Sequence, residues 1–526
     1  MITLSGGPDR THRLVFWAVL GAALIVRIIA FQGYSDSDPR SYAELADQAA
    51  RGIAYQPAQG DWNTYALRVG TYLPAALLIR LIGLSELSIT AFPFLISILS
   101  CLLAYHFGRR LFDRPTGLVA LGIAALVPID VQFASLLHSD AIAAFWANLA
   151  LFILWRLCES RWRGWSLPAA FLSGLLFGLS WLSRESVVYL IPFVLLLLLL
   201  SNTSRNGQLA VRLRLLLMVG VGTGALTVLG VETAYYFHRT GDLLYRLHTT
   251  ENNFRVCAAL FFDSSSAVFG WQDGGYLRAL LKRLLYAGPR DILLSRLYLC
   301  LPALALLGMA WKAYAGRHQH LLVNLWFITL LLMFNFMTSS FSSYKPLVII
   351  DRYLYQLMLP AILVTAHFLA QLLREGRNRE SQFWGVVLLC GLLALSGRGL
   401  VTITTNRVQT VEREISKGLA DGQVLYTDHY SLAGLIFFRD RRLAGTSAIN
   451  RSWERAVTGP AGETTWERLA VTDFPPGSYI LVNPETFSFL TDLYRYEPPA
   501  FAVSPPPNWE VVRQVRQATL YRVAAP

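Results

Sequence analysis

Long apolar runs, separated by short charged gaps, fill most of the chain up to residue 403. Most are close to the length of about 20 residues that a helix needs to cross the hydrocarbon core of a membrane. The eleven runs cover residues 14–33, 86–107, 116–137, 140–158, 166–182, 186–200, 215–236, 291–311, 320–338, 353–373 and 383–403. This pattern predicts an all-α polytopic membrane protein with about eleven transmembrane helices.

The tail after residue 404 has a different pattern and is predicted to form a separate domain. It is charged and contains Pro-rich stretches, and helical patterning appears near residues 432–438. Its short β-type runs are residues 423–427, 478–482 and 519–523. We therefore predict a transmembrane domain over residues 1–404 and a small α/β domain over residues 405–526.

The composition supports a membrane location. Hydrophobic residues make up 54% of the chain and charged residues 15%, against about 25% charged in an ordinary soluble domain. The formal net charge of +12 could indicate a nucleic-acid partner, but the basic residues cluster in the gaps between apolar runs, as at Arg109–Arg114 and Arg374–Arg379. This positive-inside pattern predicts membrane lipids, and no nucleic acid, as partners. It places the N-terminus in the cytoplasm, and the segment 34–85 and the tail outside.

The predicted topology collects charged residues on the outer side of the membrane. They are Asp36, Asp38, Asp130, Asp140, Arg184, Glu185, Lys345, Asp351 and Arg352. A charged group at membrane depth costs free energy unless a cavity, a partner or a substrate compensates it. The sequence has no GxxxxGK[ST] or strand-borne GxGxxG phosphate loop, so any phosphate in the reaction is predicted to be carried by a lipid.

Some of these residues could instead be structural. Asp38 precedes Pro39, which is typical of a helix start, and Asp140 could cap the helix that follows it. Arg184 and Glu185 could be interfacial residues that reach the headgroups from a short turn. A cap explains neither the doubled acid beside the first span nor its position at the membrane edge, which favours a functional site. Two adjacent opposite charges between apolar runs are unusual and favour a site role for Arg184 and Glu185. Asp130, which follows Pro128, is interpreted as structural.

In order and spacing, these segments resemble the GT-C glycosyltransferases, in particular the bacterial protein-mannosyltransferase-like and lipid A aminoarabinose-transferase-like branch, glycosyltransferase families 39 and 83. The matching segments are Tyr34–Ala46, Leu137–Asp140, Gly178–Glu185, Asp351–Leu354 leading to Pro360, and Val424–Asp428. The resemblance covers nearly the whole chain. It implies a GT-C helical bundle, two amphipathic helices in the first outer loop, and a C-terminal periplasmic α/β domain.

The resemblance also implies an activity and assigns roles to residues. The protein would be a hexosyl- or pentosyltransferase of the bacterial inner membrane. It would move a single sugar, with inversion, from a polyprenyl-phosphate donor to an acceptor hydroxyl at the periplasmic face. The acceptor would be lipid A, a glycan or a protein. The catalytic base would be Asp38 or, as the alternative, Asp36. The remaining roles would be donor-phosphate binding by Arg184, Arg352 and Lys345, and positioning of the acceptor or a loop by Asp140, Glu185 and Tyr42.

The sequence leaves three points open. If Mg²⁺ or Mn²⁺ is required, Asp38 and Asp140 are the predicted ligands, and no other cofactor is expected. A flippase or transporter of lipid-linked sugars would also place charges in a cavity, although a carrier needs them near the middle of the bilayer. A glycan ligase or polymerase would use an oligosaccharide on a diphospholipid in place of a single sugar.

Overall fold

The structure, a computed structural model, falls into two units. It describes residues 8–35, 37–58, 60–159, 166–200, 207–261, 281, 283–311, 318–337, 350–374, 379–406, 409–420, 422–443, 447–458, 464–487 and 497–524. The membrane unit consists of Met1–Gln32, Ala54–Ala75 and Thr90–Asn406. The tail unit consists of Gly33–Ile53, Ala76–Ile89 and Arg407–Pro526. Each unit is described by itself.

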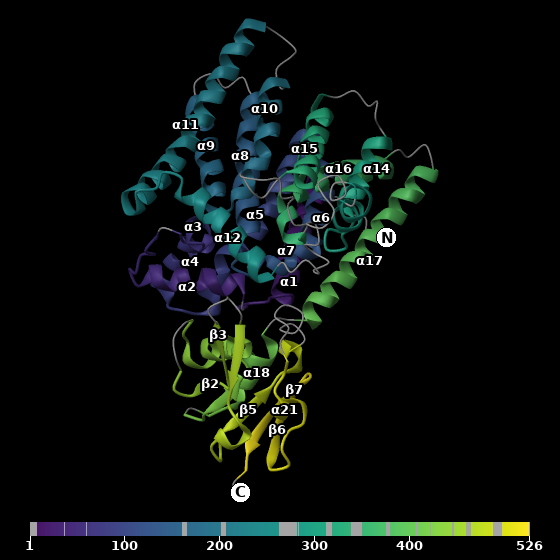
Figure 1. Ribbon diagram of the computed structural model, residues 1–526. Helices are drawn as coiled ribbons and strands as arrows, with labels where there is room; N and C mark the ends of the chain where they lie inside the picture. The colour runs from purple at the N-terminus through teal and green to yellow at the C-terminus, as the bar shows by residue number, and fades with distance from the viewer. Residues whose placement is uncertain are drawn as a thin grey trace. The chain divides into compact units, whose positions relative to one another are not determined.

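The membrane unit is built from helices (Figure 1). Two of its longer helices, α4 (Val69–Ile82) and α5 (Glu86–Leu111), belong in part to the tail unit. The other longer helices are α1 (Pro8–Ile29), α6 (Arg114–Leu126), α8 (Ser139–Glu159), α9 (Ser166–Ser183), α10 (Ile191–Leu200), α11 (Gly207–Thr240), α12 (Tyr245–Phe261), α14 (Leu301–Trp311), α15 (His318–Phe336), α16 (Tyr355–Arg374) and α17 (Arg379–Thr405). Shorter elements are α3 (Thr64–Leu67), α7 (Pro128–Phe133), the 3₁₀ helices η1 (Glu185–Leu190) and η4 (Asp351–Leu354), and the π-helix η3 (Arg283–Leu293).

The predicted fold class, a mostly helical membrane protein with a small C-terminal sheet, is confirmed. Among the described residues, seven helices are long and apolar enough to cross a membrane: α1, α5, α8, α9, α11, α16 together with η4, and α17. Shorter apolar helices accompany them, including α4, which the sequence pattern did not single out as a span. The predicted run 116–137 is interrupted because Val127, which precedes Pro128, adopts an extended conformation that ends α6. The run 291–311 becomes α-helical only from Leu301.

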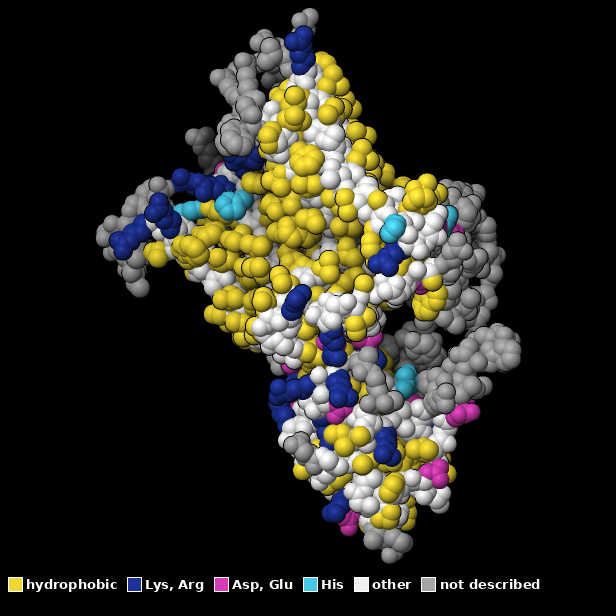
Figure 2. All heavy atoms as spheres, turned by 90° about the vertical axis from the view of Figure 1, so that its left-hand side faces the viewer, with side chains coloured by type: hydrophobic (Ala, Val, Ile, Leu, Met, Phe, Trp, Pro, Cys, Tyr) yellow, Lys and Arg dark blue, Asp and Glu magenta, His cyan; other side chains and the backbone are white. Residues whose placement is uncertain are grey.

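The surface of the membrane unit is apolar in the way that a lipid environment requires. Hydrophobic side chains cover most of the face that Figure 2 shows of this unit. On α11 alone, Leu215, Val219, Leu226 and Val231 are each more than half exposed. Apolar area on this scale is rare on soluble monomers, and together with the seven helices long enough to cross a membrane it identifies a multi-pass membrane protein.

Two ion pairs join the segments that carry clustered basic residues, at one end of the helices. Arg110 at the end of α5 pairs with Glu159 at the end of α8, with a nitrogen–oxygen distance of 2.9 Å. At the end of α16, Arg374 pairs with Asp113, which caps the start of α6. The beginning of α8, with Asp140, is the opposite end of the same helix. The two kinds of charged segment that the sequence assigned to opposite sides therefore lie at opposite ends of α8.

A buried ion pair joins α1 to α7 inside the bundle. Arg27 is fully buried and pairs with Asp130, whose side chain is 4% exposed. The guanidinium also donates to Ser97 Oγ of α5 at 2.6 Å and to the carbonyl of Ala125 in α6 at 3.0 Å. Ser97 Oγ in turn donates to Asp130 Oδ2 at 2.6 Å. These bonds satisfy both charged groups, so the pair fastens the first helix to its neighbours.

The tail unit contains a mixed sheet with the strand order β2-β1-β5-β7-β6. Its strands are β1 (Leu425–Thr427), β2 (Asn450–Ser452), β5 (Tyr479–Val482), β6 (Trp509–Val515) and β7 (Ala518–Val523), and β3 (Glu454–Thr458) pairs separately with β4 (Thr464–Arg468). β1 runs parallel to β2 and β5, whereas β7 is antiparallel to both β5 and β6. The helical elements are α2 (Asp38–Ala50), α18 (Thr410–Gly418), α19 (His429–Leu435), η5 (Ile436–Asp440), η6 (Val471–Asp473) and α21 (Ala500–Val503).

Alternation along the strands divides the tail core between the two faces of the sheet. Leu425 and Leu481 belong to the cluster that includes Ile415 of α18, whereas the neighbouring Tyr426 and Ile480 belong to another cluster that includes Trp453, Phe474 and Trp509. Successive side chains of a strand point to opposite faces. The three β-type runs noted in the sequence are strands β1, β5 and β7.

The first-loop segments of the tail unit pack against its C-terminal part. The ring of Tyr34 stacks on Phe437 with 4.1 Å between ring centroids. Glu86 accepts a hydrogen bond from the backbone N–H of Tyr34 at 2.9 Å and pairs with Arg413 of α18 at 2.6 Å. The beginning and the end of the chain therefore contribute to one compact unit.

Loss of Arg27 should destabilise the protein, because Asp130 would remain buried without its counterion. We expect Arg27→Met to cost about 3 to 5 kcal/mol, and Arg27→Met combined with Asp130→Leu to recover much of that loss. The measurement is the thermal unfolding midpoint of the purified full-length protein in detergent. Arg10→Met, an exposed position on the same helix, is the control. Equal midpoints for the single and double variants would contradict the coupling.

The tail unit should lose stability as the pH rises towards neutrality. Burial raises the pKa of Glu412 in α18 to about 7, because the ionised carboxylate would lose its hydration. A folded-state pKa above the ordinary value of 4.5 gives stability that is complete below about pH 4.5 and is lost as the pH rises through about 7, by at most about 3 kcal/mol. Glu412→Gln should remove this loss.

Hydrogen exchange of the β1 and β5 amides in the full-length protein measures this effect. The variant and the wild type are compared at each pH from 5 to about 8, so that the intrinsic exchange rate cancels. We expect their protection to diverge towards higher pH, with Glu412→Gln the more protected. Glu414→Gln, on the same helix but 37% exposed at its side chain, is the control. Protection that diverges towards low pH would refute the assignment.

Candidate functional site

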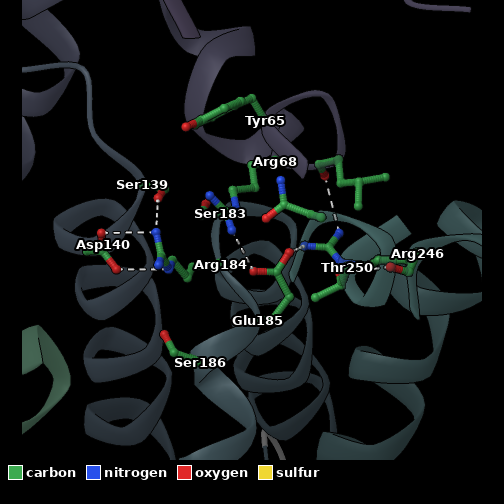
Figure 3. Close-up of polar contacts among 12 residues, drawn as sticks. Tyr65, Arg68, Ser139, Asp140, Ser183, Arg184, Glu185, Ser186, Arg246 and Thr250 are labelled. Atoms are coloured by element: carbon green, nitrogen blue, oxygen red, sulfur yellow. Dashed lines mark hydrogen bonds and ion pairs between the residues drawn. The ribbon is translucent and has the colours of Figure 1, made fainter. Parts of the chain in front are cut away.

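Arg184 and Asp140 form the central contact of the candidate site. Arg184 follows α9 in an extended conformation, and Asp140 lies in the first turn of α8. The guanidinium grips both carboxylate oxygens, with Nε 2.9 Å from Oδ1 and Nη1 3.2 Å from Oδ2. Nη1 also donates to Ser139 Oγ at 3.1 Å (Figure 3). This two-point contact fixes the end of α9 against the start of α8.

Arg352 reaches the same carboxylate through His138. Arg352 Nη1 lies 3.0 Å from His138 Nε2, and His138 Nδ1 lies 3.0 Å from Asp140 Oδ2. Because a guanidinium can only donate, Nε2 of His138 accepts and the ring proton resides on Nδ1, facing Asp140. Tyr353 presents its ring to both cations, 4.4 Å from Arg184 and 5.4 Å from Arg352. Two guanidinium groups from distant segments thus share one anchoring assembly.

Glu185 points to the other side of the turn, towards two further arginines (Figure 3). Its Oε2 lies 3.2 Å from Nη2 of Arg68, and its Oε1 lies 2.8 Å from Nη2 of Arg246. Arg68 follows α3 and Arg246 lies in α12. The adjacent charges that stood out in the sequence therefore organise two neighbouring networks, one around Arg184 and one around Glu185.

Arg246, which the sequence analysis did not propose for the site, connects several elements. It donates to the carbonyl of Leu67 at 3.2 Å and to that of Trp181 at 2.8 Å. It also pairs with Glu232 of α11, and its guanidinium lies 4.6 Å from the Trp181 ring. The sequence signal for Arg246 was weak, because it stands in the long stretch between the apolar runs 215–236 and 291–311, without a recognisable motif.

A cavity of about 650 Å³ opens beside Arg246, between α9, α10, α11 and α12. Its wall is almost entirely apolar, with side chains such as Phe177, Leu198 and Met218. Trp181, Glu232 and Arg246, which contact one another, form a polar part of its lining. Volume and lining are those of a ligand pocket, in which a few polar groups fix the orientation of an apolar ligand. The cavity can hold a hydrocarbon chain with an anionic head at the arginine.

The structure brings together part of the predicted site within the membrane unit. Asp140 contacts Arg184 directly and is linked to Arg352 through His138. Glu185 lies beside Arg184 but faces the Arg68–Arg246 side. Asp36 and Lys345 lie outside the described residues. Asp38 and Tyr42 belong to the tail unit. Sequence reasoning did not propose His138, Arg68, Arg246 or Glu232 as members of these networks.

Asp38 begins α2 and does not cap it. The cap position is taken by Ser37, whose side chain makes no capping hydrogen bond. Ser37 has φ 78° and ψ −142°, a conformation that costs a residue with a side chain about 1 to 3 kcal/mol. Asp38 is half-buried, whereas Tyr42 one turn later is fully buried. Strained backbone of this kind clusters at functional sites.

The described residues contain no group of three or more His, Cys, Asp or Glu side chains arranged to hold a metal ion. Asp140, one of the two acids named as possible ligands, has its carboxylate engaged by Arg184 and His138. The arrangement that these residues do form is suited to anions. Guanidinium groups bind phosphate oxygens through paired, charge-assisted hydrogen bonds.

Comparisons with known proteins agree with this architecture. The family described as dolichyl-phosphate-mannose-protein mannosyltransferase matches residues 69–229. The chain is similar to ArnT from Cupriavidus metallidurans in the apo state, at 13% identity and a TM-score of 0.50, over 97% of this chain and 99% of that chain. It is also similar to the apo oligosaccharyltransferase from Archaeoglobus fulgidus, at 12% identity and a TM-score of 0.50 over 83% of this chain.

The chain spans 65% of the length of the archaeal oligosaccharyltransferase. A search among curated proteins finds no match. At these identities the structural likeness concerns the fold, and the family match over residues 69–229 adds sequence evidence for the segment that carries Asp140, Arg184 and Glu185. The resemblance noted in the sequence is supported at this level: residues 69–229 match a mannosyltransferase family, and the fold is similar to those of ArnT and the archaeal oligosaccharyltransferase.

Proposed function

We propose that this protein transfers a single sugar from a polyprenyl-phosphate donor to an acceptor hydroxyl, with inversion at the sugar. The observation that carries the proposal is the apolar cavity whose polar part includes Arg246, beside the network that holds Arg184 and Glu185. The family that matches residues 69–229 is named for a lipid-phosphate sugar donor, which supports the same class of substrate.

The donor lipid fits the two parts of this site. Its isoprenoid chain would occupy the cavity among α9, α10, α11 and α12, where burial of apolar surface supplies binding free energy. Its phosphate would lie at the polar part of the lining, near Arg246. Arg184 and Arg352, with Lys345, would stabilise the negative charge that grows on the phosphate as it leaves the sugar.

The chemical step is a single displacement. The first-loop carboxylate, Asp38 or alternatively Asp36, would accept the proton of the acceptor hydroxyl, as a general base within hydrogen-bond reach does. The acceptor oxygen would then bond to the anomeric carbon while the bond from that carbon to the phosphate oxygen breaks. The products are the glycosylated acceptor and polyprenyl phosphate, and one displacement inverts the configuration.

Sidedness and acceptor complete the proposal. The basic gaps would face the cytoplasm of a bacterial inner membrane, and the Asp140 end of α8 would face the periplasm together with the tail unit. Asp140, Glu185 and Tyr42 would position the acceptor or the surrounding loops. Lipid A, an envelope glycan or a protein are the acceptors considered. Mass spectrometry of all three fractions, from cells with and without the protein, should reveal one fraction that has lost a hexose or pentose.

Substitution of the base should abolish transfer. When expressed in cells that lack the native protein, the wild type should restore the missing sugar and Asp38→Asn should not. The reason is that an amide cannot accept the proton of the acceptor hydroxyl. The measurement is the mass of the affected envelope fraction, with membrane insertion checked by detergent extraction. Asp47→Asn, on the same helix and paired with Arg51, is the control. Full transfer by Asp38→Asn, Asp36→Asn and the double variant would refute the assignment of the base.

Substitution of Arg184 should weaken donor binding and transfer. We expect Arg184→Gln to lower the affinity for undecaprenyl phosphate about tenfold or more, because one charge-assisted phosphate contact is lost. Titration of the purified full-length protein with that lipid, followed by native mass spectrometry, gives the affinity. Arg110→Gln, at the other end of the helices, is the matched control. Equal affinities of wild type and Arg184→Gln would remove Arg184 from the phosphate site.

A further inference from the structure

Glu232 is an acid in the wall of an apolar cavity, and the proposed transfer reaction gives it no role. It lies in α11, and its side chain is only 9% exposed. Of the residues that line the cavity, Glu232 and Arg246 are the two with charged side chains. A carboxylate among membrane helices is costly, so its presence in the polar part of a lipid cavity calls for a physical explanation.

Two contacts hold Glu232 in place. Oε1 pairs with Nη1 of Arg246, and Oε2 accepts a hydrogen bond from Trp181 Nε1 at 2.7 Å. Both partners also line the cavity. The carboxylate is therefore fixed where an anionic headgroup at Arg246 would experience its charge.

The contacts of Arg246 limit how much negative charge this part of the cavity can accept. Nη1 is engaged by Glu232 and by the carbonyl of Leu67, and Nη2 by Glu185 and by the carbonyl of Trp181. The remaining donor, Nε–H, is buried and has no hydrogen-bond partner. Two carboxylates therefore already balance the charge of Arg246.

We propose that Glu232 sets the headgroup charge that the cavity accepts, selecting lipids with one phosphate over lipids with a diphosphate. This inference rests on the proposed function and narrows its substrate class. A second phosphate adds about one negative charge, and the fixed carboxylate of Glu232 repels it in a region of low dielectric constant. A neutral side chain at position 232 leaves Arg246 paired only with Glu185 and removes this repulsion.

The test compares two lipids on the full-length protein. Undecaprenyl phosphate and undecaprenyl diphosphate are titrated against wild type and Glu232→Gln in detergent, and native mass spectrometry gives both dissociation constants. We expect the wild type to prefer the monophosphate. Glu232→Gln should move the ratio of the two dissociation constants about tenfold towards the diphosphate, which corresponds to about 1.4 kcal/mol.

Control variants separate charge from structure. Glu232→Asp keeps the charge and should keep the wild-type ratio, and Glu159→Gln removes an ion-paired acid at the opposite end of the helices and should also leave it unchanged. Glu232→Met provides a second neutral side chain should Glu232→Gln not yield folded protein. A ratio that is the same in wild type and in the neutral variant overturns the inference about Glu232 but leaves the proposed function intact. Failure of the wild type to bind either lipid would instead count against the proposed donor.

Discussion

Pairing of charges inside an apolar helical bundle is the constraint on which the membrane unit depends. Removing one partner of a buried ion pair costs about 3 to 5 kcal/mol, and a lone charge among lipid-facing helices is at least as unfavourable. Arg27, Arg184 and Arg246 each satisfy this constraint with a carboxylate and with backbone or hydroxyl oxygens. These contacts join helices that are far apart in the sequence, and so the polar groups also determine how the apolar helices are arranged.

The three arginines meet the constraint with different consequences. Arg27 and Asp130 are enclosed and saturated with hydrogen bonds, which is typical of a structural pair. Arg184 shares Asp140 with an assembly that also includes Arg352, so that cations outnumber carboxylates there among the described residues. Arg246 borders a cavity. The enclosed pair of Arg27 thus holds the bundle together, whereas the pairs of Arg184 and Arg246 are placed where they can meet a substrate.

The tail unit is stabilised by different interactions from those of the membrane unit. Its stability comes from apolar clusters on both faces of a sheet that includes the C-terminal strands, and its first-loop segments are fastened by Tyr34, Glu86 and Arg413. The segment that carries Asp38 therefore belongs to a compact unit and is not an isolated loop. A strained residue directly before Asp38 needs such support, because the surrounding structure has to maintain the conformation.

The sequence by itself determined the helical membrane class and the α/β tail with β1, β5 and β7. It also singled out Asp140, Arg184 and Arg352, which the structure links through His138. These follow from local signals: apolar length, strand alternation, and charges that are costly in a membrane. Only the tertiary structure decided that Arg246 and Glu232 border a cavity and that Glu185 faces Arg68 and Arg246 rather than Asp140. It also decided that Gly33–Ile53 and Ala76–Ile89 belong with the tail. Contacts between distant segments leave no periodic trace in the chain, because they depend on how helices and strands pack and not on the order of neighbouring residues.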